Sequence, residues 1–158
     1  MIDQHAQFIK EAVEIAATNA GSGIGGPFGA IIVKDGKEIG RGVNRVTGTN
    51  DPTAHAEVVA IRNACQNIDD FRLEGAVIYA SCEPCPMCLA AIYWARISAI
   101  YFAADNTDAS KAGFDDSYIY KEVRLPLEKR SIPIKKIETG NASKPFDEWI
   151  RLEQKIDY

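Results

Sequence analysis

The chain lacks both a long apolar run and a cluster of basic residues. None of its segments approaches the length of a membrane span, and the N-terminal stretch MIDQHAQFIKEAVEIAATNA has no apolar core of the kind found in signal peptides. We therefore expect a cytoplasmic protein that does not bind membranes. The formal net charge of −4 also disfavours a large nucleic-acid surface, although it does not exclude a local basic groove.

Cysteine is scarce as well. The chain has four cysteines, and three of them, Cys82, Cys85 and Cys88, lie in the stretch SCEPCPMCLA. Structural disulfides are rare in the cytoplasm, so disulfide pairing is the less favoured use of these residues. We expect Cys65, late in a predicted helix, to be a small core residue, and His5, near the terminus, to be a solvated surface residue.

No repeat, low-complexity segment or linker interrupts the 158 residues, which predicts a single domain over residues 1–158. The spacing of apolar residues predicts a helix over residues 3–20. The Asp-Gly pair at 35–36 predicts a hairpin that joins two strands within residues 30–44. A loop then leads into a second helix, with Asp51 as its N-cap and Pro52 in its first turn.

The second half of the chain alternates between the two kinds of element. Residues 76–81 predict a buried strand, residues 86–96 a helix and residues 97–104 another strand, a unit whose strands are normally parallel. Residues 112–123 read as a loop with some helix, residues 131–139 as a last strand, and residues 145–156 as a last helix with Ser143 as N-cap. This order predicts helices on both faces of a mixed sheet, a three-layer α/β domain.

Two short patterns carry the chemistry. The first, TAHAEV, places His55 two residues before Glu57, and the second, PCPMC, contributes Cys85 and Cys88. Cys85 and Cys88 are one helical turn apart at a predicted helix start, so both sulfurs can reach one ion in their thiolate form. With His55 they would give zinc three protein ligands. Structural zinc sites usually have four, whereas catalytic sites leave one position for water.

Glu57 favours the catalytic interpretation, because a hydrolytic site needs a carboxylate that moves protons between water and substrate. Residues two apart on a helix do not share a face, so His55 and Glu57 must approach the metal from different sides. Two other interpretations stay open. A CxxC at a helix start after a strand is also typical of a redox pair, and Cys82 as a fourth ligand would close the site and leave it structural.

The combined pattern H-x-E … P-C-x-x-C is the signature of the zinc deaminases, and the chain resembles the cytidine deaminase superfamily. Within that superfamily it is similar to the short bacterial guanine deaminases, over nearly its whole length and notably in GIGGPFGAIIVKDG, SCEPCPMCL and AGFDDSYIYKE. The resemblance implies an α/β/α sandwich around a five-stranded mixed sheet. It also implies one Zn²⁺ per chain on His55, Cys85 and Cys88, Glu57 as proton shuttle, and a homodimer that exchanges C-terminal segments.

The resemblance further implies a pocket for a purine base. It assigns to this pocket an amide, a carboxylate, two aromatic residues and a closing C-terminal tyrosine: Asn44, Asp116, Phe28, Trp94 and Tyr158. Simpler roles stay open, since Asn44 could be a turn residue and Phe28 a core residue. Trp94 could lie in the core or at a dimer interface, and Tyr158 could be a frayed end. The sequence does not separate Asp116 from its neighbour Asp115.

The reaction implied by the resemblance is hydrolytic deamination of guanine to xanthine and ammonia, with attack at C2 and with Glu57 transferring the protons. One alternative is a related deaminase that acts on cytosine, a nucleoside or adenosine in tRNA. A tRNA enzyme should carry a basic binding surface and an open pocket that admits a flipped nucleotide. The alternative from another class is a structural zinc or redox module without activity.

Overall fold

The computed structural model describes residues 3–158, which divide into two compact units, the first ending at Ser117 and the second comprising Tyr118–Tyr158. Unit 1 contains α1 (Gln4–Ser22), β1 (Gly29–Lys34), β2 (Lys37–Val43), α2 (Val46–Thr49), α3 (Ala56–Ile68), β3 (Val77–Cys82), α4 (Pro86–Trp94), β4 (Ala99–Ala104) and α5 (Asn106–Lys111). At the boundary begins α6 (Ser117–Arg124), and unit 2 continues with a 3-10 helix (Leu127–Lys129) and α7 (Lys144–Arg151).

The single domain with an exchanged C-terminal segment stays a prediction. Among the helices described, none is both long and apolar enough to cross a membrane.

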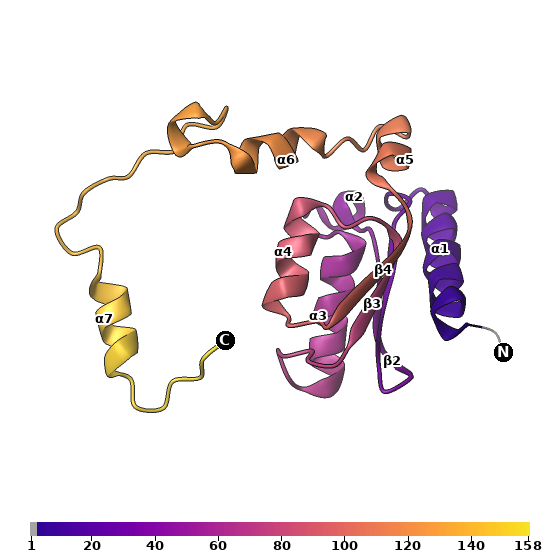
Figure 1. Cartoon of the computed structure of the whole chain (residues 1–158), viewed down its shortest axis with the longest axis horizontal. Coiled ribbons are helices and arrows are strands. Elements are labelled where there is room, and N and C mark those ends of the chain that lie inside the picture. The colour runs from indigo at the N-terminus through magenta and orange to yellow at the C-terminus, as the bar shows by residue number, and fades with distance from the viewer. Residues whose placement is uncertain (1–2) are drawn as a thin grey trace. The chain divides into compact units, whose positions relative to one another are not determined.

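Unit 1 is built on a four-stranded mixed sheet in the order β2-β1-β3-β4. Strand β1 pairs antiparallel with β2 and β3, whereas β3 and β4 are parallel and are joined through α4. Helix α1 covers one face of the sheet, and α3 and α4 cover the other (Figure 1). The predicted three-layer α/β architecture and the parallel strand–helix–strand unit are therefore confirmed.

The central strand β1 is buried on both faces. Ala30 and Ile32 belong to the core that lies under α3 and α4, whereas Ile31 and Val33 belong to the core under α1. Successive side chains of a strand point to opposite faces, so these four residues supply both cores in turn. A strand covered on both sides must be apolar throughout, which explains the uninterrupted AIIV run.

The predicted hairpin is confirmed at the turn between β1 and β2. Asp35 has φ +51° and Gly36 has φ +73°, so both central residues are left-handed. This is the conformation that a two-residue type I′ turn requires, and it matches the right-handed twist of the flanking strands. The Asp-Gly pair therefore sets the register that carries β2 back along β1.

The second helix begins later than the sequence predicts. Helix α3 starts at Ala56, with His55 as its N-cap, and the short helix α2 precedes it. Asp51 does not cap α3, because its side chain accepts hydrogen bonds from the backbone N–H of Thr53 at 2.8 Å and from the Thr53 hydroxyl at 2.6 Å. Asp51 thus closes an Asx turn, a local alternative that acidic side chains offer to helix capping.

The predicted fifth strand is absent from the described chain, so the expectation of a five-stranded sheet is wrong for this structure. Residues 131–139 form neither strand nor helix, and Ile132, Ile134 and Ile137 are exposed. The β-branched isoleucines suit a strand, but a strand also needs a partner for its backbone groups, and the described unit 2 contains no other strand. The last helix is present as α7, where the Ser143 hydroxyl donates to Asp147 at 3.2 Å.

Helix α3 lies unusually close to β2, where glycine is required. A Cβ atom added to Gly42 would lie 2.3 Å from the backbone oxygen of Ala56 and 2.5 Å from the backbone nitrogen of Ala60. Neither backbone atom can move without displacing the helix. The absence of a side chain at Gly42 therefore sets the distance between α3 and the sheet, and with it the position of the start of α3.

We expect Gly42→Ala to lower the free energy of unfolding by about 3 kcal/mol, because the new methyl group overpacks backbone against backbone. Gly21→Ala is the matched control. Nothing lies within 4 Å of a Cβ added at Gly21, which is in α1, so this variant should gain about 0.5–1 kcal/mol. Urea unfolding of both variants measures the difference. Equal effects would contradict the close packing of α3 on β2.

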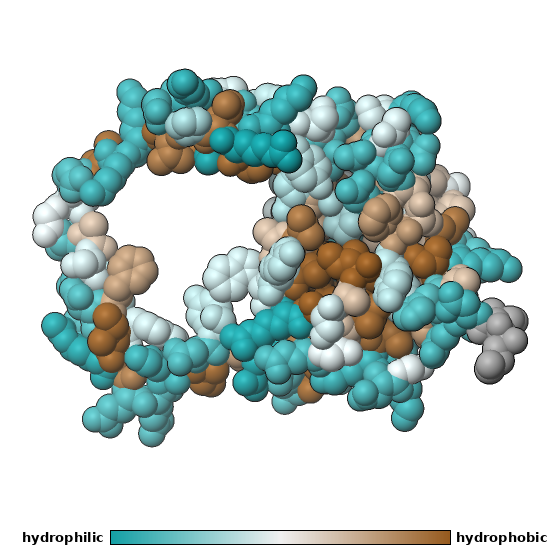
Figure 2. Space-filling model, viewed as in Figure 1, coloured by the Kyte–Doolittle hydropathy of each residue, from teal (hydrophilic) through white to brown (hydrophobic). Residues whose placement is uncertain are grey.

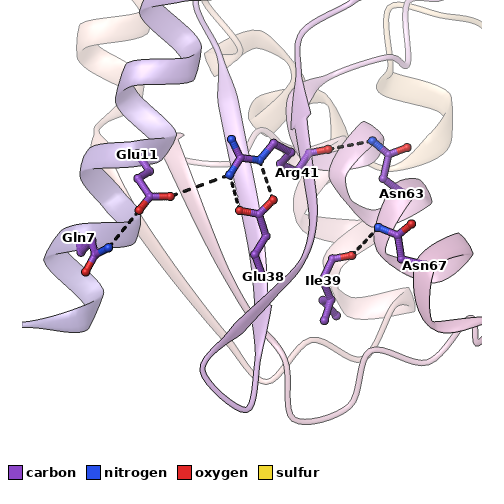
Figure 3. Close-up of polar contacts among 7 residues, drawn as sticks. All are labelled: Gln7, Glu11, Glu38, Ile39, Arg41, Asn63 and Asn67. Atoms are coloured by element: carbon purple, nitrogen blue, oxygen red, sulfur yellow. Dashed lines mark hydrogen bonds and ion pairs between the residues drawn. The ribbon is translucent and has the colours of Figure 1, made fainter.

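The outer edge of β2 is covered by side chains rather than by another strand. From α3, Asn63 donates to the carbonyl of Arg41 at 2.8 Å, and Asn67 donates to the carbonyl of Ile39 at 2.9 Å (Figure 3). The Arg41 guanidinium also pairs with Glu38 of the same strand. Unpaired edge groups invite pairing with other chains, so the two amides protect this edge of the sheet.

Candidate active site

The candidate metal site is formed by residues at the N-termini of α3 and α4. His55 is the N-cap of α3 and Cys85 is the N-cap of α4, and neither side chain caps its own helix. Glu57 and Cys88 follow in the first turns of α3 and α4. Helix N-termini carry positive partial charge, which favours thiolates and carboxylates near them. The two helices thus deliver one imidazole, two sulfurs and one carboxylate to the same place.

The distances within this group match a zinc site. The Nδ1 atom of His55 lies 3.5 Å from the sulfur of Cys85 and 3.5 Å from the sulfur of Cys88. All three candidate ligand atoms lie within 4.8 Å of one another. Tetrahedral zinc with ordinary Zn–S and Zn–N bonds would place nitrogen and sulfur about 3.6 Å apart. The residues present therefore fit one zinc ion held by three ligands.

The charges of the group also suit a dication. Hydrogen bonds from Cys88 and then from His55 lower the pKa of Cys85 to about 4, against the opposing effect of burial. The pKa of Cys88 is raised, because its thiol is hydrogen-bonded to Cys85 and is buried. The hydrogen bond to Cys85 raises the pKa of His55. Zinc binds cysteine as the thiolate, so a bound dication would displace the proton from any thiol among its ligands.

Glu57 lies beside the ligands without joining them. Its side chain is buried, and its Oε2 accepts a hydrogen bond from the thiol of Cys88 at 3.4 Å. Burial is the largest cause of the raised pKa of this carboxyl group. The candidate ligand set consists of His55, Cys85 and Cys88. A buried carboxyl group next to a three-ligand site is placed as a proton-transfer residue requires.

Cys82 stands apart from this group despite its even spacing with the other two cysteines. Its buried sulfur donates to the backbone carbonyl of Asp105, at 3.5 Å. Burial, followed by the charge of Glu57, raises the pKa of Cys82 to about 11, so the thiol stays protonated. Cys82 also lies outside the group of candidate ligands, which consists of His55, Cys85 and Cys88. This geometry disfavours the closed four-ligand site.

Asn44 is buried at the end of β2, and its side chain is fixed by backbone groups. Its Oδ1 accepts hydrogen bonds from the N–H groups of Gly26 and Val46, each at 3.2 Å. Phe28 is distant from Asn44 in the sequence but adjacent in space, because the backbone N–H of Asn44 donates to the carbonyl of Phe28 at 3.1 Å. The structure therefore brings these two predicted base-binding residues together.

The sequence missed Phe114, which packs edge-on against Phe28. The centroids of the two rings are 5.0 Å apart, and their planes meet at 88°. Phe114 lies in the AGFDD stretch, two residues before Asp116, so its position could have indicated a role near the predicted site. No pattern of spacing distinguishes it from a core aromatic residue.

The structure separates the two neighbouring carboxylates. Asp116 is half-buried, and its pKa is raised first by burial and then by the negative charge of Cys85. Asp115 is exposed and accepts a hydrogen bond from the backbone N–H of Ser117, at 2.9 Å, at the start of α6. Asp116 is thus the carboxylate that is influenced by the candidate metal site. Glu83, also missed by the sequence interpretation, adds to the raised pKa of Asp116.

The two remaining predicted site residues are Trp94 and Tyr158. Trp94 ends α4, at the opposite end from Cys88, and its 68% exposure excludes a role in the core of unit 1. Tyr158 belongs to unit 2, where its ring packs edge-on against Trp149 with centroids 6.4 Å apart. For both residues, contact with a base stays a prediction.

Comparison with known proteins places this geometry among deaminases. The cytidine and deoxycytidylate deaminase zinc-binding region matches residues 2–104. The guanine deaminase of Bacillus subtilis (strain 168) is 53% identical over 154 residues, which are 98% of this chain and 99% of that protein. A tRNA-specific adenosine deaminase of Agrobacterium fabrum is 45% identical over 96 residues, 61% of this chain and 63% of that protein.

Solved structures give the same relationship. The crystal structure of the guanine deaminase from Bacillus subtilis superposes with a TM-score of 0.95 at 52% identity and covers 98% of both chains. The guanine deaminase from Nitrosomonas europaea superposes with a TM-score of 0.65 at 29% identity, over 69% of this chain and 63% of that one. The similarity to the Bacillus protein therefore extends through both units, beyond the zinc-binding region.

Proposed function

This chain belongs to the cytidine and deoxycytidylate deaminase family and is a homologue of the bacterial guanine deaminases, and on that premise we propose that it hydrolyses guanine to xanthine and ammonia. The single observation that carries the chemistry is the convergence of His55, Cys85 and Cys88, with Glu57 in contact with the Cys88 thiol. A metal-free redox pair would not need the histidine or the carboxylate. The arrangement is the one that hydrolytic zinc chemistry requires.

His55, Cys85 and Cys88 would hold one zinc ion per chain. When bound, zinc acts as a Lewis acid that makes water acidic enough to serve as a nucleophile near neutral pH. Glu57 takes a proton from the attacking water and delivers it to a ring nitrogen of guanine as C2 becomes tetrahedral. Glu57 then takes the remaining proton from the new hydroxyl group on C2 and delivers it to the amino group, the bond between C2 and this nitrogen breaks, and ammonia leaves. The oxygen of the water remains on C2, which gives xanthine.

The base would be held by the residues near Asn44. Because the Asn44 Oδ1 is bound to two backbone N–H groups, the amide offers its own N–H groups to an acceptor on the purine. Asp116 accepts from a ring N–H or from the exocyclic amine, and Phe28 packs against the ring with support from Phe114. The roles of Trp94 and Tyr158 in binding the base rest on the resemblance alone.

The working form would be a cytoplasmic homodimer that exchanges C-terminal segments. Helix α7 of unit 2 exposes Phe146, Trp149 and Ile150, which lie three and four residues apart and therefore share one face. Unit 1 exposes Trp94 at the end of α4 and Tyr101 and Phe102 on β4, and Figure 2 shows hydrophobic side chains at the surface of this unit. Exposed apolar surfaces of this kind mark contact sites, and a second copy of the chain supplies the complementary surface.

The substrate can be identified by measuring ammonia release from guanine, adenine, cytosine, cytidine and guanosine, each offered separately, with a tRNA anticodon stem-loop as a sixth substrate. We expect guanine to react at a rate at least about 100-fold above the others, since a site built to hydrogen-bond its substrate rejects analogues that leave its polar groups unpaired. An inert guanine together with a reactive second base would contradict the assignment of substrate and leave the zinc chemistry intact.

A further inference from the structure

Asn19 is a polar residue in an unusual place. It lies near the C-terminal end of α1 and is only 9% exposed, although amides in helices are normally solvated. Its Nδ2 atom donates to the backbone carbonyl of Gly26 at 2.8 Å and to the backbone carbonyl of Asn44 at 2.9 Å. Both N–H groups of one amide are therefore used to hold two segments that are distant in the sequence.

The two segments also hold each other. The N–H of Gly26 donates to the Asn44 side chain, and the carbonyl of Gly26 accepts from the N–H of Phe28 at 2.9 Å as well as from Asn19. These bonds fix the orientation of the Asn44 amide, with its oxygen toward the backbone. The Asn44 N–H groups are consequently the part of the side chain available to a ligand.

The glycine at position 25 makes this arrangement sterically feasible. A Cβ atom added to Gly25 would lie 1.9 Å from the Asn44 carbonyl oxygen and 3.0 Å from the Asn19 Nδ2. The loop and the end of β2 thus approach each other as closely as two backbones can. Asn19 lies beside Gly25 and supplies the donor for the buried Asn44 carbonyl, while it shares the Gly26 carbonyl with the Phe28 N–H.

We infer that Asn19 is a positioning residue for the base-binding site: it acts through Asn44 and holds that amide, together with the Gly26 loop, in the geometry that binds the purine. The inference rests on the proposed function. Without Asn19, the buried Asn44 carbonyl loses its donor and the Gly26 carbonyl keeps only the Phe28 N–H, so the link from α1 to both segments is lost. A displaced Asn44 amide binds the base less well in the ground state and in the transition state alike, which raises KM, although the metal site itself is untouched.

The test is a double-mutant cycle on the zinc-loaded enzyme with guanine as substrate. Asn19→Leu preserves the size of the side chain and removes both donors, and we expect kcat/KM to fall by roughly 10–100-fold, mostly through KM. In an Asn44→Ala background the Gly26 N–H has already lost its acceptor, so Asn19→Leu should then change kcat/KM by less than about threefold. Zinc content should remain that of the wild type throughout.

Two further variants keep the test decisive. Asn19→Ser, which is too short to reach both carbonyls, replaces Asn19→Leu in the cycle if the leucine variant does not fold. Thr18→Ala is the control, because the exposed hydroxyl of Thr18 bonds only to the Glu14 carbonyl within α1, and its kcat/KM should match the wild type.

The possible results distinguish a failure of the positioning role from a failure of the proposed function. The same loss of kcat/KM from Asn19→Leu in both backgrounds would overturn the inference and make Asn19 a support of the fold alone. A loss confined to kcat with unchanged KM would overturn it too. Wild-type enzyme that releases no ammonia from guanine would instead reject the proposed function, and the positioning role with it.

Discussion

Glu57→Gln will retain zinc but lose release of ammonia from guanine, with kcat reduced by about 10²–10⁴-fold, the contribution typical of a proton-transferring side chain. The amide preserves the size and shape of the carboxyl group and can still hydrogen-bond to Cys88. It cannot accept the proton of the attacking water or pass it to the leaving amine. Metal binding should survive, because the three candidate ligands are His55, Cys85 and Cys88.

The measurement is steady-state ammonia release together with zinc content by atomic absorption. Glu74→Gln is the matched control, since Glu74 is an exposed carboxylate that pairs with Arg96 on the surface of unit 1. Its activity should equal that of the wild type. Wild-type activity in the Glu57→Gln variant would rule out Glu57 as the shuttle, and loss of zinc from that variant would mean that Glu57 supports the metal directly.

Cys88→Ser will weaken zinc binding by more than about 100-fold, because even the loss of an outer-shell partner of a zinc ligand commonly costs 10–100-fold. Cys88 is completely buried, and its sulfur is 3.5 Å from the imidazole of His55. The serine hydroxyl is too weakly acidic to replace a thiolate, so two ligands would remain. Ammonia release from guanine should disappear with the metal. A competition assay against a chromophoric chelator gives the affinity.

Cys82→Ser provides the control within the same ten residues. Its hydroxyl can keep the hydrogen bond to the Asp105 carbonyl, and Cys82 lies outside the candidate ligand set. Zinc affinity and activity should both remain within about threefold of the wild type, because no bond to the metal is lost. Loss of zinc from this variant would show that Cys82 is a fourth ligand and that the site is closed.

The four strands of unit 1 and its longer helices α1, α3 and α4 could be predicted because their signals are local, whereas the short helices α2 and α5 were missed. The Asp-Gly turn, the apolar run of β1 and the apolar spacing of α1 depend on residues that are neighbours in the chain. The start of α3 could not be predicted in this way. Asp51 has the side chain of a good N-cap, and only the competing bond to Thr53 directs it to a turn instead.

The last predicted strand failed for a related reason. The isoleucines of residues 131–139 have the β-branched side chains that favour a strand, but the ladder of backbone hydrogen bonds needs a second segment. The nine residues themselves do not show whether a second segment lies beside them to pair with. Helix α7, whose hydrogen bonds are internal, is present as predicted, although it spans Lys144–Arg151 and ends before the predicted end at residue 156.

The sequence by itself determined the α/β class and the candidates His55, Glu57, Cys85 and Cys88. The signals behind these predictions are the spacing of ligands within a helical turn, the turn residues and the periodicity of apolar residues, and all of them involve residues that are neighbours in the chain. Only the tertiary structure decided that α3 and α4 begin at the same place, that Cys82 turns to Asp105, and that Asn19 reaches Asn44. Those contacts depend on how distant elements pack on a shared sheet. The pattern of apolar residues shows which face of an element is buried, but it does not show which distant residues that face will meet.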